Sequence, residues 1–349
     1  MKTLKDFEFK NKRVLVRCDF NVPLDEQGNI LDDFRIKMTI PTIEYLIKKG
    51  AKLLLMSHLD RPRGKVVESL RFTPVQNRLT EYLDVSIVKA RDSIGKEIEK
   101  WAKGMQPGDI LLLENLRFHI EEEENDKNFA KELSKLGDIY INDAFGACHR
   151  AHASIVGIPK YLPSGAGLLL EKEIRILKDL MERPKKSMIA IIGGKKVETK
   201  VKLIDKISEI ADWVLIGGLI KKEIKEKKIN LRFPQKIVEP LDALNEKGED
   251  FDIGPKTIDL FKEKISLAKT IFWNGPLGKI EETEFSEGTA EIAKAIIKSK
   301  AFSVAGGGET VEFINKLGMA EKFNHLSTGG GAMLAFLSGE KLPGLEALK

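Results

Sequence analysis

The stretch GLLLEKEIRILKDLMERP, residues 167–184, separates two parts of the chain that carry different chemistry. Its apolar residues recur at the spacing of one helix face, and they are Leu170, Ile174, Leu177 and Met181. This pattern predicts one amphipathic helix. Apolar runs before this helix end in Arg, His, Asp or Asn, whereas those after it end mostly in Gly. We therefore expect the helix to join one domain that holds an anion to another that holds a nucleotide.

The length and composition are those of a globular protein with about two domains. Hydrophobic residues make up 42% and charged residues 32% of the 349 residues. No apolar run reaches the roughly 18 residues that a membrane span needs, and the first residues lack the apolar core of a signal peptide. Two cysteines, Cys18 and Cys148, cannot form a disulfide framework. We expect a cytoplasmic protein without a membrane partner.

The net charge of +5 is mildly basic, but opposite charges are mixed along runs such as LIKKEIKEKK, residues 219–228. Mixed charge is typical of solvated helix faces. A nucleic-acid-binding surface would also need aromatic residues for base stacking, and these are only 7% of the chain. We therefore expect no nucleic-acid partner, and salt-dependent binding would be needed to support that alternative.

Short apolar runs alternate with helical patterns along the whole chain. In the first half they cover residues 13–21, 52–61, 84–90, 109–117 and 138–145. In the second half they cover residues 188–196, 213–219, 236–240, 270–276, 302–309 and 325–331. Near-continuous apolar strands that alternate with helices indicate parallel sheets covered on both faces. The sequence therefore predicts an α/β protein with two doubly wound parallel-sheet domains joined by the central helix.

The strand ends of the first half carry the side chains of an anion site, because ligands of such sheets bind beyond the carboxyl ends of the strands. The candidates are Arg17, Asp19, Asn21, Arg35, His58, Arg61, Arg117, His149, Arg150 and His152. Several arginines on one face offer paired donors for phosphate or carboxylate groups, and Asp19 and Asn21 can hold a hydroxyl. The set suits a small, anionic, hydroxylated metabolite.

Simpler interpretations compete for single members of this set. An arginine after a strand is about as often a surface ion pair. Cys148, His149 and His152 lack a second ligand pair at zinc-like spacing, so structural or anion-binding histidines are favoured over a metal site. We expect Asp143 to cap or brace its loop and the acidic run 121–124 to be a solvated helix start.

Glycine-rich turns mark the second half. Residues 193–196 (GGKK) and 306–310 (GGGET) each follow an apolar run and precede a helical pattern, where backbone N–H groups can face a phosphate. Lys196 and Lys200 lie four residues apart, so both can point toward the same charge. The sequence contains neither the P-loop motif nor G-x-G-x-x-G, which argues against P-loop NTPases, protein kinases and standard dinucleotide binders. Phe272 and Trp273 are expected in the core.

The combined motifs resemble the phosphoglycerate kinase family over nearly the whole chain. They are RVLVRCDFNVP (13–23), SHLDRP (57–62), ENLRF (114–118), DAFGACHRAHAS (143–154), IIGGKKV (191–197), DIGP (252–255), WNGPLG (273–278), GGGET (306–310) and STGGGA (327–332). The resemblance implies two Rossmann-like domains, with the C-terminal tail returning to the first. The expected boundaries are 1–166, the helix 167–184, 185–334 and a tail of about 335–349.

The resemblance also implies the reaction and its residues. Phosphoryl transfer links 1,3-bisphosphoglycerate and Mg-ADP to 3-phosphoglycerate and ATP, with Mg²⁺ as the cofactor, in a protein expected to be a monomer. The resemblance assigns the ten candidates above to the phosphoglycerate site, with Arg17, His149 and His152 in the surrounding basic patch. Arg35, Lys196 and Lys200 are the expected catalytic residues. The nucleotide site takes Gly193, Gly194, Lys200, Asn274, Glu281, Gly306, Gly307, Gly308, Glu309 and Thr310, with Glu309 at the metal.

The chain departs from the family pattern mainly in its second half. Glu309 replaces an Asp, Leu219 stands where the family has Gly, Lys195 replaces a small residue, and the region 221–252 is shorter than usual. In the first half, Asp60 replaces a Gly. These changes leave open an alternative, a catalytically weak homologue retained as a nucleotide-binding protein. If the two ligands bind to different domains, the central helix is the expected hinge.

Overall fold

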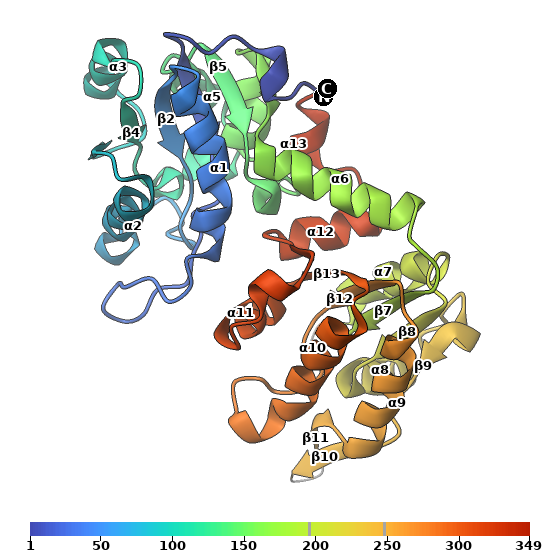
Figure 1. The fold of residues 1–349 in the computed structure, drawn as a ribbon. Helices are drawn as coiled ribbons and strands as arrows, with labels where there is room; N and C mark the ends of the chain where they lie inside the picture. The colour runs from blue at the N-terminus through green and yellow to red at the C-terminus, as the bar shows by residue number, and fades with distance from the viewer. Residues whose placement is uncertain (195–196, 247–248) are drawn as a thin grey trace. The chain divides into compact units, whose positions relative to one another are not determined.

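The computed structural model describes residues 1–194, 197–246 and 249–349. The chain forms two compact units (Figure 1), one of residues Met1–Ile174 with Lys341–Lys349 and the other of residues Arg175–Glu340. The boundary between the units falls inside the helix α6 (Leu168–Glu182), which is the helix that the opening stretch predicts. Of its predicted apolar face, Leu170 and Leu177 are buried, whereas Ile174 and Met181 are only partly covered.

The first unit is built on a six-stranded sheet in the order β3-β4-β2-β1-β5-β6, with every neighbouring pair parallel. The strands are β1 (Arg13–Arg17), β2 (Lys52–Met56), β3 (Ile87–Lys89), β4 (Ile110–Leu112), β5 (Ile139–Asn142) and β6 (Ser164–Ala166). The helices before α6 are α1 (Phe34–Lys48), α2 (Thr73–Leu83), α3 (Lys96–Gly104), α4 (Ile120–Glu123) and α5 (Lys127–Ser134). The parallel sheet is as predicted, except that β6 was not foreseen.

The register of this sheet gathers the site residues at one edge. Val14, Leu15 and Val16 of β1 are fully buried, because both faces of the central strand are covered. Arg17, the last residue of β1, pairs in register with Met56 of β2 and with Asn142 of β5. The loops that follow these three strands therefore leave the sheet from the same side.

The second unit contains another six-stranded parallel sheet, in the order β14-β13-β12-β7-β8-β9. The strands are β7 (Met188–Ile192), β8 (Trp213–Ile216), β9 (Ile237–Val238), β12 (Thr270–Asn274), β13 (Phe302–Gly306) and β14 (His325–Leu326). The helices are α7 (Glu198–Ser208), α8 (Gly218–Glu226), α9 (Pro255–Ser266), α10 (Glu287–Ser299), α11 (Gly308–Lys316) and α12 (Gly330–Leu337). Asn274 pairs with Ile192 on one side and Gly306 on the other, so both glycine-rich turns start at one edge.

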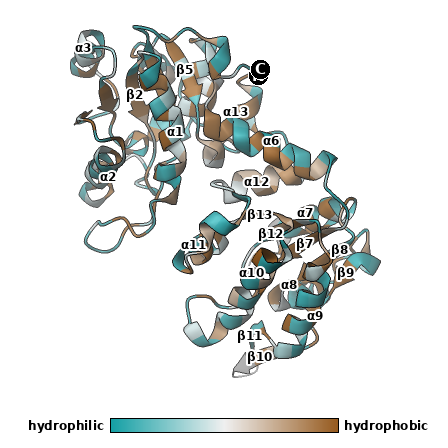
Figure 2. Ribbon diagram, viewed as in Figure 1, coloured by the Kyte–Doolittle hydropathy of each residue, from teal (hydrophilic) through white to brown (hydrophobic). Residues whose placement is uncertain are grey.

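A two-stranded antiparallel hairpin, β10 (Ala243–Glu246) and β11 (Glu249–Ile253), lies outside the two main sheets. It was not predicted, because four of its nine strand residues are charged and the others do not form the apolar run of a buried strand. Figure 2 shows the contrast with the main sheets, whose strands are brown where the covering helices are partly teal. No helix among the described residues is long and apolar enough to span a membrane.

Two sets of hydrogen bonds hold the start of α6 and the C-terminal helix α13 (Pro343–Glu346) in the first unit. Asp143 follows β5, and its Oδ1 accepts hydrogen bonds from the backbone N–H groups of Leu169 (2.9 Å) and Leu170 (3.2 Å). Asp143 therefore caps the start of α6, a helix distant in sequence, whereas the sequence predicted that it caps or braces its own loop. Helix α13 belongs to the same unit, where the Gly344 N–H donates to the Cys148 carbonyl at 2.9 Å.

Candidate functional site

Three strand-end loops of the first unit are hydrogen-bonded to one another. Arg17, the last residue of β1, lies 3.2 Å from His58 after β2, measured from Nη2 to Nδ1. The Asp60 N–H donates to Oδ1 of Asn21 at 2.8 Å, and Nη1 of Arg117 donates to the Asp60 carbonyl at 2.6 Å. The candidates that the sequence scatters over a hundred residues therefore converge, as the parallel topology predicts.

Arg35 reaches this cluster from the first turn of α1. Its Nη1 donates to the Asn21 carbonyl at 2.5 Å and lies 3.9 Å from Oδ1 of Asp19. The Arg35 side chain is 27% exposed, so its remaining donors can reach a ligand. Arg61 is exposed on the loop after β2.

Burial and like charge depress the proton affinity of the cluster. Burial, and then the neighbouring arginine charges, lowers the pKa of His152 to about 3 and holds that of His58 well below its usual range. Burial lowers the pKa of Arg117 to about 10, with Glu123 opposing and Arg150 adding to the fall. Both histidines are therefore neutral at physiological pH, and the arginines supply the positive charge.

Buried polar nitrogens without a hydrogen-bond partner concentrate in the same place. In the described part of the chain, five buried side-chain polar atoms lack a hydrogen-bond partner, and four of them are nitrogens of this cluster. They are Nε and Nη2 of Arg117, Nδ1 of His149 and Nδ1 of His152. Two of these nitrogens have a carboxylate nearby, because the Arg117 Nε lies 3.3 Å from Glu123 Oε1 and the His152 Nδ1 lies 3.8 Å from Glu122 Oε1. Because buried polar groups are normally paired, these nitrogens mark a place where a ligand's oxygen atoms would bind.

Two residues of this region differ from their expected environment. Arg17 is fully buried, and its guanidinium is engaged by Ser154 Oγ (2.7 Å), the Cys18 carbonyl (2.5 Å) and His58. The prediction that the acidic run 121–124 is a solvated helix start is wrong for Glu122. That residue is fully buried in α4, because its carboxylate accepts two hydrogen bonds from Ser154.

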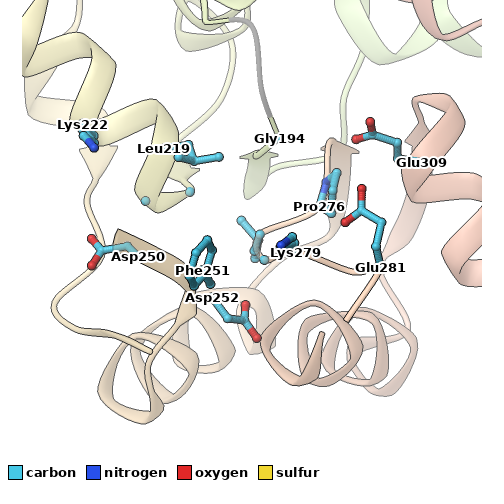
Figure 3. Close-up of a pocket in the computed structure, with 14 residues that line it drawn as sticks. Gly194, Leu219, Lys222, Asp250, Phe251, Asp252, Pro276, Lys279, Glu281 and Glu309 are labelled. Carbon is cyan, nitrogen blue, oxygen red and sulfur yellow. The ribbon is translucent and has the colours of Figure 1, made fainter. Parts of the chain in front are cut away.

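A cavity of about 360 Å³ opens at the strand ends of the second unit (Figure 3). Its wall is formed by Gly194, Gly217, Gly218, Leu219, Lys222, Asp250, Phe251, Asp252, Pro276, Leu277, Gly278, Lys279, Glu281 and Glu309. Figure 3 shows Glu281 and Glu309 on one side and Lys222 and Asp250 on the opposite side. Of the expected nucleotide residues, Gly194, Glu281 and Glu309 line this cavity.

Other expected nucleotide residues do not line the cavity but form turns at the ends of β12 and β13. Nδ2 of Asn274 donates to the Gly306 carbonyl at 2.9 Å, and Oγ1 of Thr310 accepts from the Gly275 N–H at 3.0 Å. Gly307 has φ 104°, a conformation that favours glycine. Gly308 begins α11, and a Cβ added there would meet no atom within 4 Å. The GGGET turn therefore presents open backbone at a helix start.

A close approach of two backbones requires Gly193. A Cβ at this position would lie 2.1 Å from the Pro276 carbonyl oxygen.

Trp273 and the neighbouring Phe272 are both fully buried, which confirms their predicted place in the core.

The Lys200 side chain reaches from α7 to the turn that contains Gly193. It is 6% exposed, and its Nζ donates to the Gly193 carbonyl. Burial lowers the pKa of Lys200 to about 8, although the charges of Glu309 and Glu223 act in the opposite direction. Lys196, the other expected catalytic lysine, lies outside the described residues.

Sequence reasoning missed the hairpin side of the cavity. Asp250, Phe251 and Asp252 come from β11, and Asp252 is nearly fully buried, accepting from the Gly288 N–H at 2.7 Å. Burial raises the pKa of Asp252 to about 6. The only available signal was the run EDFDIGP, residues 249–255, whose apolar residues are too few to predict a strand.

Comparisons with known proteins agree over the whole chain. The family model described as phosphoglycerate kinase matches residues 4–232 and 224–340. The chain belongs to the phosphoglycerate kinase family. It is 43% identical to the phosphoglycerate kinase of Chlorobium phaeobacteroides (strain BS1), covering 99% of both chains. It is 44% identical to that of Dictyoglomus turgidum, covering 99% of this chain and 98% of the relative.

Solved phosphoglycerate kinases share the fold. The crystal structure of the Pyrococcus horikoshii OT3 protein matches with a TM-score of 0.90 at 35% identity, covering 100% of this chain and 98% of that one. The Coxiella burnetii structure matches with a TM-score of 0.82 at 32% identity, covering 99% and 98%. The doubly wound α/β prediction is confirmed.

The structure explains one departure from the family pattern and locates others. Asp60 has φ 51°, in the left-handed region where the family's Gly is unstrained and Asp is among the better tolerated substitutes. Leu219 is 40% exposed in the cavity wall. The family model matches in two segments that meet at residues 224–232, inside the region expected to be shorter.

The residues present fit a magnesium ion carried by a nucleotide. Within the described ranges, no group of three or more His, Cys, Asp or Glu side chains could hold a metal alone. Glu309 offers an exposed carboxylate at the cavity wall, at the start of α11. Mg²⁺ is commonly held by one or two carboxylates, substrate phosphates and water, so one acid suffices.

Proposed function

We propose that this member of the phosphoglycerate kinase family is an active enzyme. It transfers a phosphoryl group reversibly between 1,3-bisphosphoglycerate and Mg-ADP, giving 3-phosphoglycerate and ATP. The observation that carries this proposal is the set of unpartnered nitrogens on Arg117, His149 and His152. A phosphorylated carboxylic acid supplies the oxygen atoms that these donors lack.

The first unit is proposed to bind the phosphoglycerate. Arg35, Arg61, Arg117 and Arg150 provide charge, and His58, His149 and His152 provide neutral N–H donors around it. Asp19 and Asn21 lie beside Arg35 and can hold the substrate hydroxyl. Because the histidines stay neutral, the affinity for the anion depends mainly on arginines, whose charge does not change near neutral pH.

The second unit is proposed to bind the nucleotide in the 360 Å³ cavity. The backbone of the turns at 193–194 and 306–310 would face the phosphates, with Thr310 and Asn274 holding the second turn in place. Both Glu281 and Glu309 line the cavity, where Glu281 would hold a ribose hydroxyl and Glu309 the nucleotide-bound Mg²⁺. When bound, Mg²⁺ neutralises phosphate charge.

Arg35, Lys196 and Lys200 are proposed to stabilise the phosphoryl group during transfer. Phosphoryl transfer needs placement and positive charge more than covalent chemistry from the protein. Lys200 is suited to this role because its ammonium is already buried beside the Gly193 carbonyl and needs little reorganisation.

A coupled assay with 3-phosphoglycerate and Mg-ATP tests the function. We expect turnover well above a blank. Folded protein that binds both ligands without turnover would refute the enzyme and favour the alternative, a nucleotide-binding homologue suggested by Glu309 and Leu219.

Arg35→Lys tests the catalytic site, with Arg13→Lys as its matched control. Lysine keeps the charge of Arg35 but loses the planar pair of donors, so the rate should fall at least about tenfold. Arg13 lies at the opposite end of β1, pairs with Asp138 at 2.5 Å and has a similarly exposed side chain. Equal effects at the two positions would show that the pocket is misplaced.

We propose a monomer that works in the cytoplasm without a nucleic-acid partner. Both cysteines are free and buried, which supports a reducing compartment. Size-exclusion chromatography with light scattering tests the monomer, and a second chain in the eluted species would contradict it.

A further inference from the structure

Glu122 is an acid buried beneath the proposed phosphoglycerate site. Its Oε1 accepts from the Ser154 hydroxyl at 2.6 Å and its Oε2 from the Ser154 N–H at 2.9 Å. Nη2 of Arg17 and Nδ1 of His152 lie 3.9 and 3.8 Å from Oε1. A carboxylate with no exposed surface requires such partners, because removing it from water without them is costly.

The hydrogen bonds of this cluster have only one possible direction. The Ser154 hydroxyl has a single hydrogen, which it donates to Glu122, so it must accept from Nε of Arg17 at 2.7 Å. Arg17 has donors and no acceptor. Its Nη2, 3.2 Å from Nδ1 of His58, therefore donates to that nitrogen.

The direction of this last bond determines the tautomer of His58. Nδ1 accepts and so carries no proton, and the neutral ring must carry its proton on Nε2. A proton on Nδ1 would place two donors against each other in a buried site, which is unfavourable. The Nε2–H is the group that can donate to a carboxylate or phosphate oxygen of a ligand.

We propose that Glu122 and Ser154 are positioning residues that hold Arg17, and through it keep His58 as an Nε2–H donor for the anionic substrate. The proposal rests on the assignment of His58 to the phosphoglycerate site. Both residues are fully buried, so the role proposed for them does not require contact with the ligand. Their effect passes along a buried chain of four side chains, Glu122, Ser154, Arg17 and His58.

Ser154→Ala in the full-length protein tests the chain, with ¹⁵N NMR of the histidine rings as the first readout. His58→Gln identifies the His58 signals. In the wild type we expect an unprotonated Nδ1 and a protonated Nε2. In Ser154→Ala, Nε of Arg17 loses its acceptor, so the signals should move toward a mixture of the two tautomers.

The second readout is kinetic. The KM for 3-phosphoglycerate should rise about three- to tenfold, the effect of weakening one ordinary hydrogen bond, whereas the KM for Mg-ATP should stay within about twofold. Ser134→Ala is the matched control, because that hydroxyl is also buried in the first unit but donates only to the Lys131 carbonyl.

Each outcome supports or overturns the proposal. Unchanged His58 signals in Ser154→Ala would overturn the chain, and an equal rise in KM in Ser134→Ala would show general loosening instead. Changed signals without a change in KM would overturn the link to substrate and place the error in the assignment of His58. If Ser154→Ala does not fold, Glu122→Gln replaces it, since Gln keeps the shape but cannot accept both bonds from Ser154.

Discussion

Replacing Lys200 by methionine should stabilise the second unit at neutral pH while removing most of the activity. Burial lowers the pKa of Lys200 from its ordinary value of 10.5 to about 8. For a residue that is 6% exposed, this fall corresponds to roughly 3 kcal/mol against the charged form in the folded state. A methionine fills similar space without a charge.

The pH dependence has a definite sign. The folded-state pKa of Lys200 lies below the unfolded value, so its charge opposes folding wherever the lysine is charged in both states, below about pH 8. Between about pH 8 and 10.5 the unfolded chain still binds the proton and the folded protein does not. The contribution of this residue to stability therefore rises with pH across that window.

The size of the effect follows from two terms. Removing the buried charge should gain roughly 3 kcal/mol at pH 7, and leaving the Gly193 carbonyl without its lysine donor should cost about 1 kcal/mol. We therefore expect Lys200→Met to stabilise the unliganded protein by about 2 kcal/mol at pH 7. At pH 10, still below the unfolded pKa of 10.5, about 1 kcal/mol of the charge term remains and offsets the lost hydrogen bond, so the variant and the wild type should be about equally stable.

Urea unfolding at pH 7 and pH 10, followed by tryptophan fluorescence, measures this difference. Trp101→Phe removes the tryptophan of the first unit, so the signal comes from Trp213 and Trp273 of the second. Lys202→Met is the control, because Lys202 lies on the same helix with an exposed side chain. A Lys200→Met protein less stable than wild type at pH 7, or equally changed at both pH values, would refute the reasoning.

Three further changes test other parts of the structure. Glu309→Gln should raise the magnesium concentration needed for half-maximal rate. Because the charge of Glu309 favours the charged form of Lys200, the variant should also lose activity at a lower alkaline pH than the wild type. Calorimetry in the presence of chelator should show that the affinity for ADP is little changed. Asp60→Gly should stabilise the protein by up to about 1 kcal/mol, since it relieves a left-handed φ of 51°; a lower thermal midpoint would contradict this. His119 donates to Asp92 at 2.6 Å, and this hydrogen bond raises the pKa of His119 although burial acts in the opposite direction. The contribution of the pair to stability is therefore present below about pH 6.5 and lost as pH rises through the folded-state pKa, so His119→Gln should destabilise the protein more at pH 5.5 than at pH 8.5. An equal loss of stability at both pH values would exclude an ion pair.

The sequence was sufficient to predict the strands and the convergence of their ends where the local pattern and the tertiary structure agree. Strands such as β1 and β7 are buried on both faces, so their apolar runs stand out, and parallel topology then places their ends together. The strands of the β10–β11 hairpin mix charged with apolar residues and lie outside both sheets, so they give no such run. Glu122 was misjudged for a related reason, because three neighbouring glutamates predict a solvated face and only the tertiary partner Ser154 explains its burial.

The positions that depart from the family pattern differ physically from those that match it. Leu219, Glu309 and Asp60 have exposed or partly exposed side chains. Solvent can therefore accommodate a change of size or charge at these positions. Arg17, by contrast, has no exposed surface, and each of its bonds depends on another buried group. Changing one member of such a network leaves a buried charge or donor without its partner, at a cost of about 3 to 5 kcal/mol when an ion pair is broken. The proposed phosphoglycerate site therefore tolerates change only at its exposed loop positions, whereas the proposed nucleotide cavity, walled largely by backbone and exposed side chains, can change residue by residue.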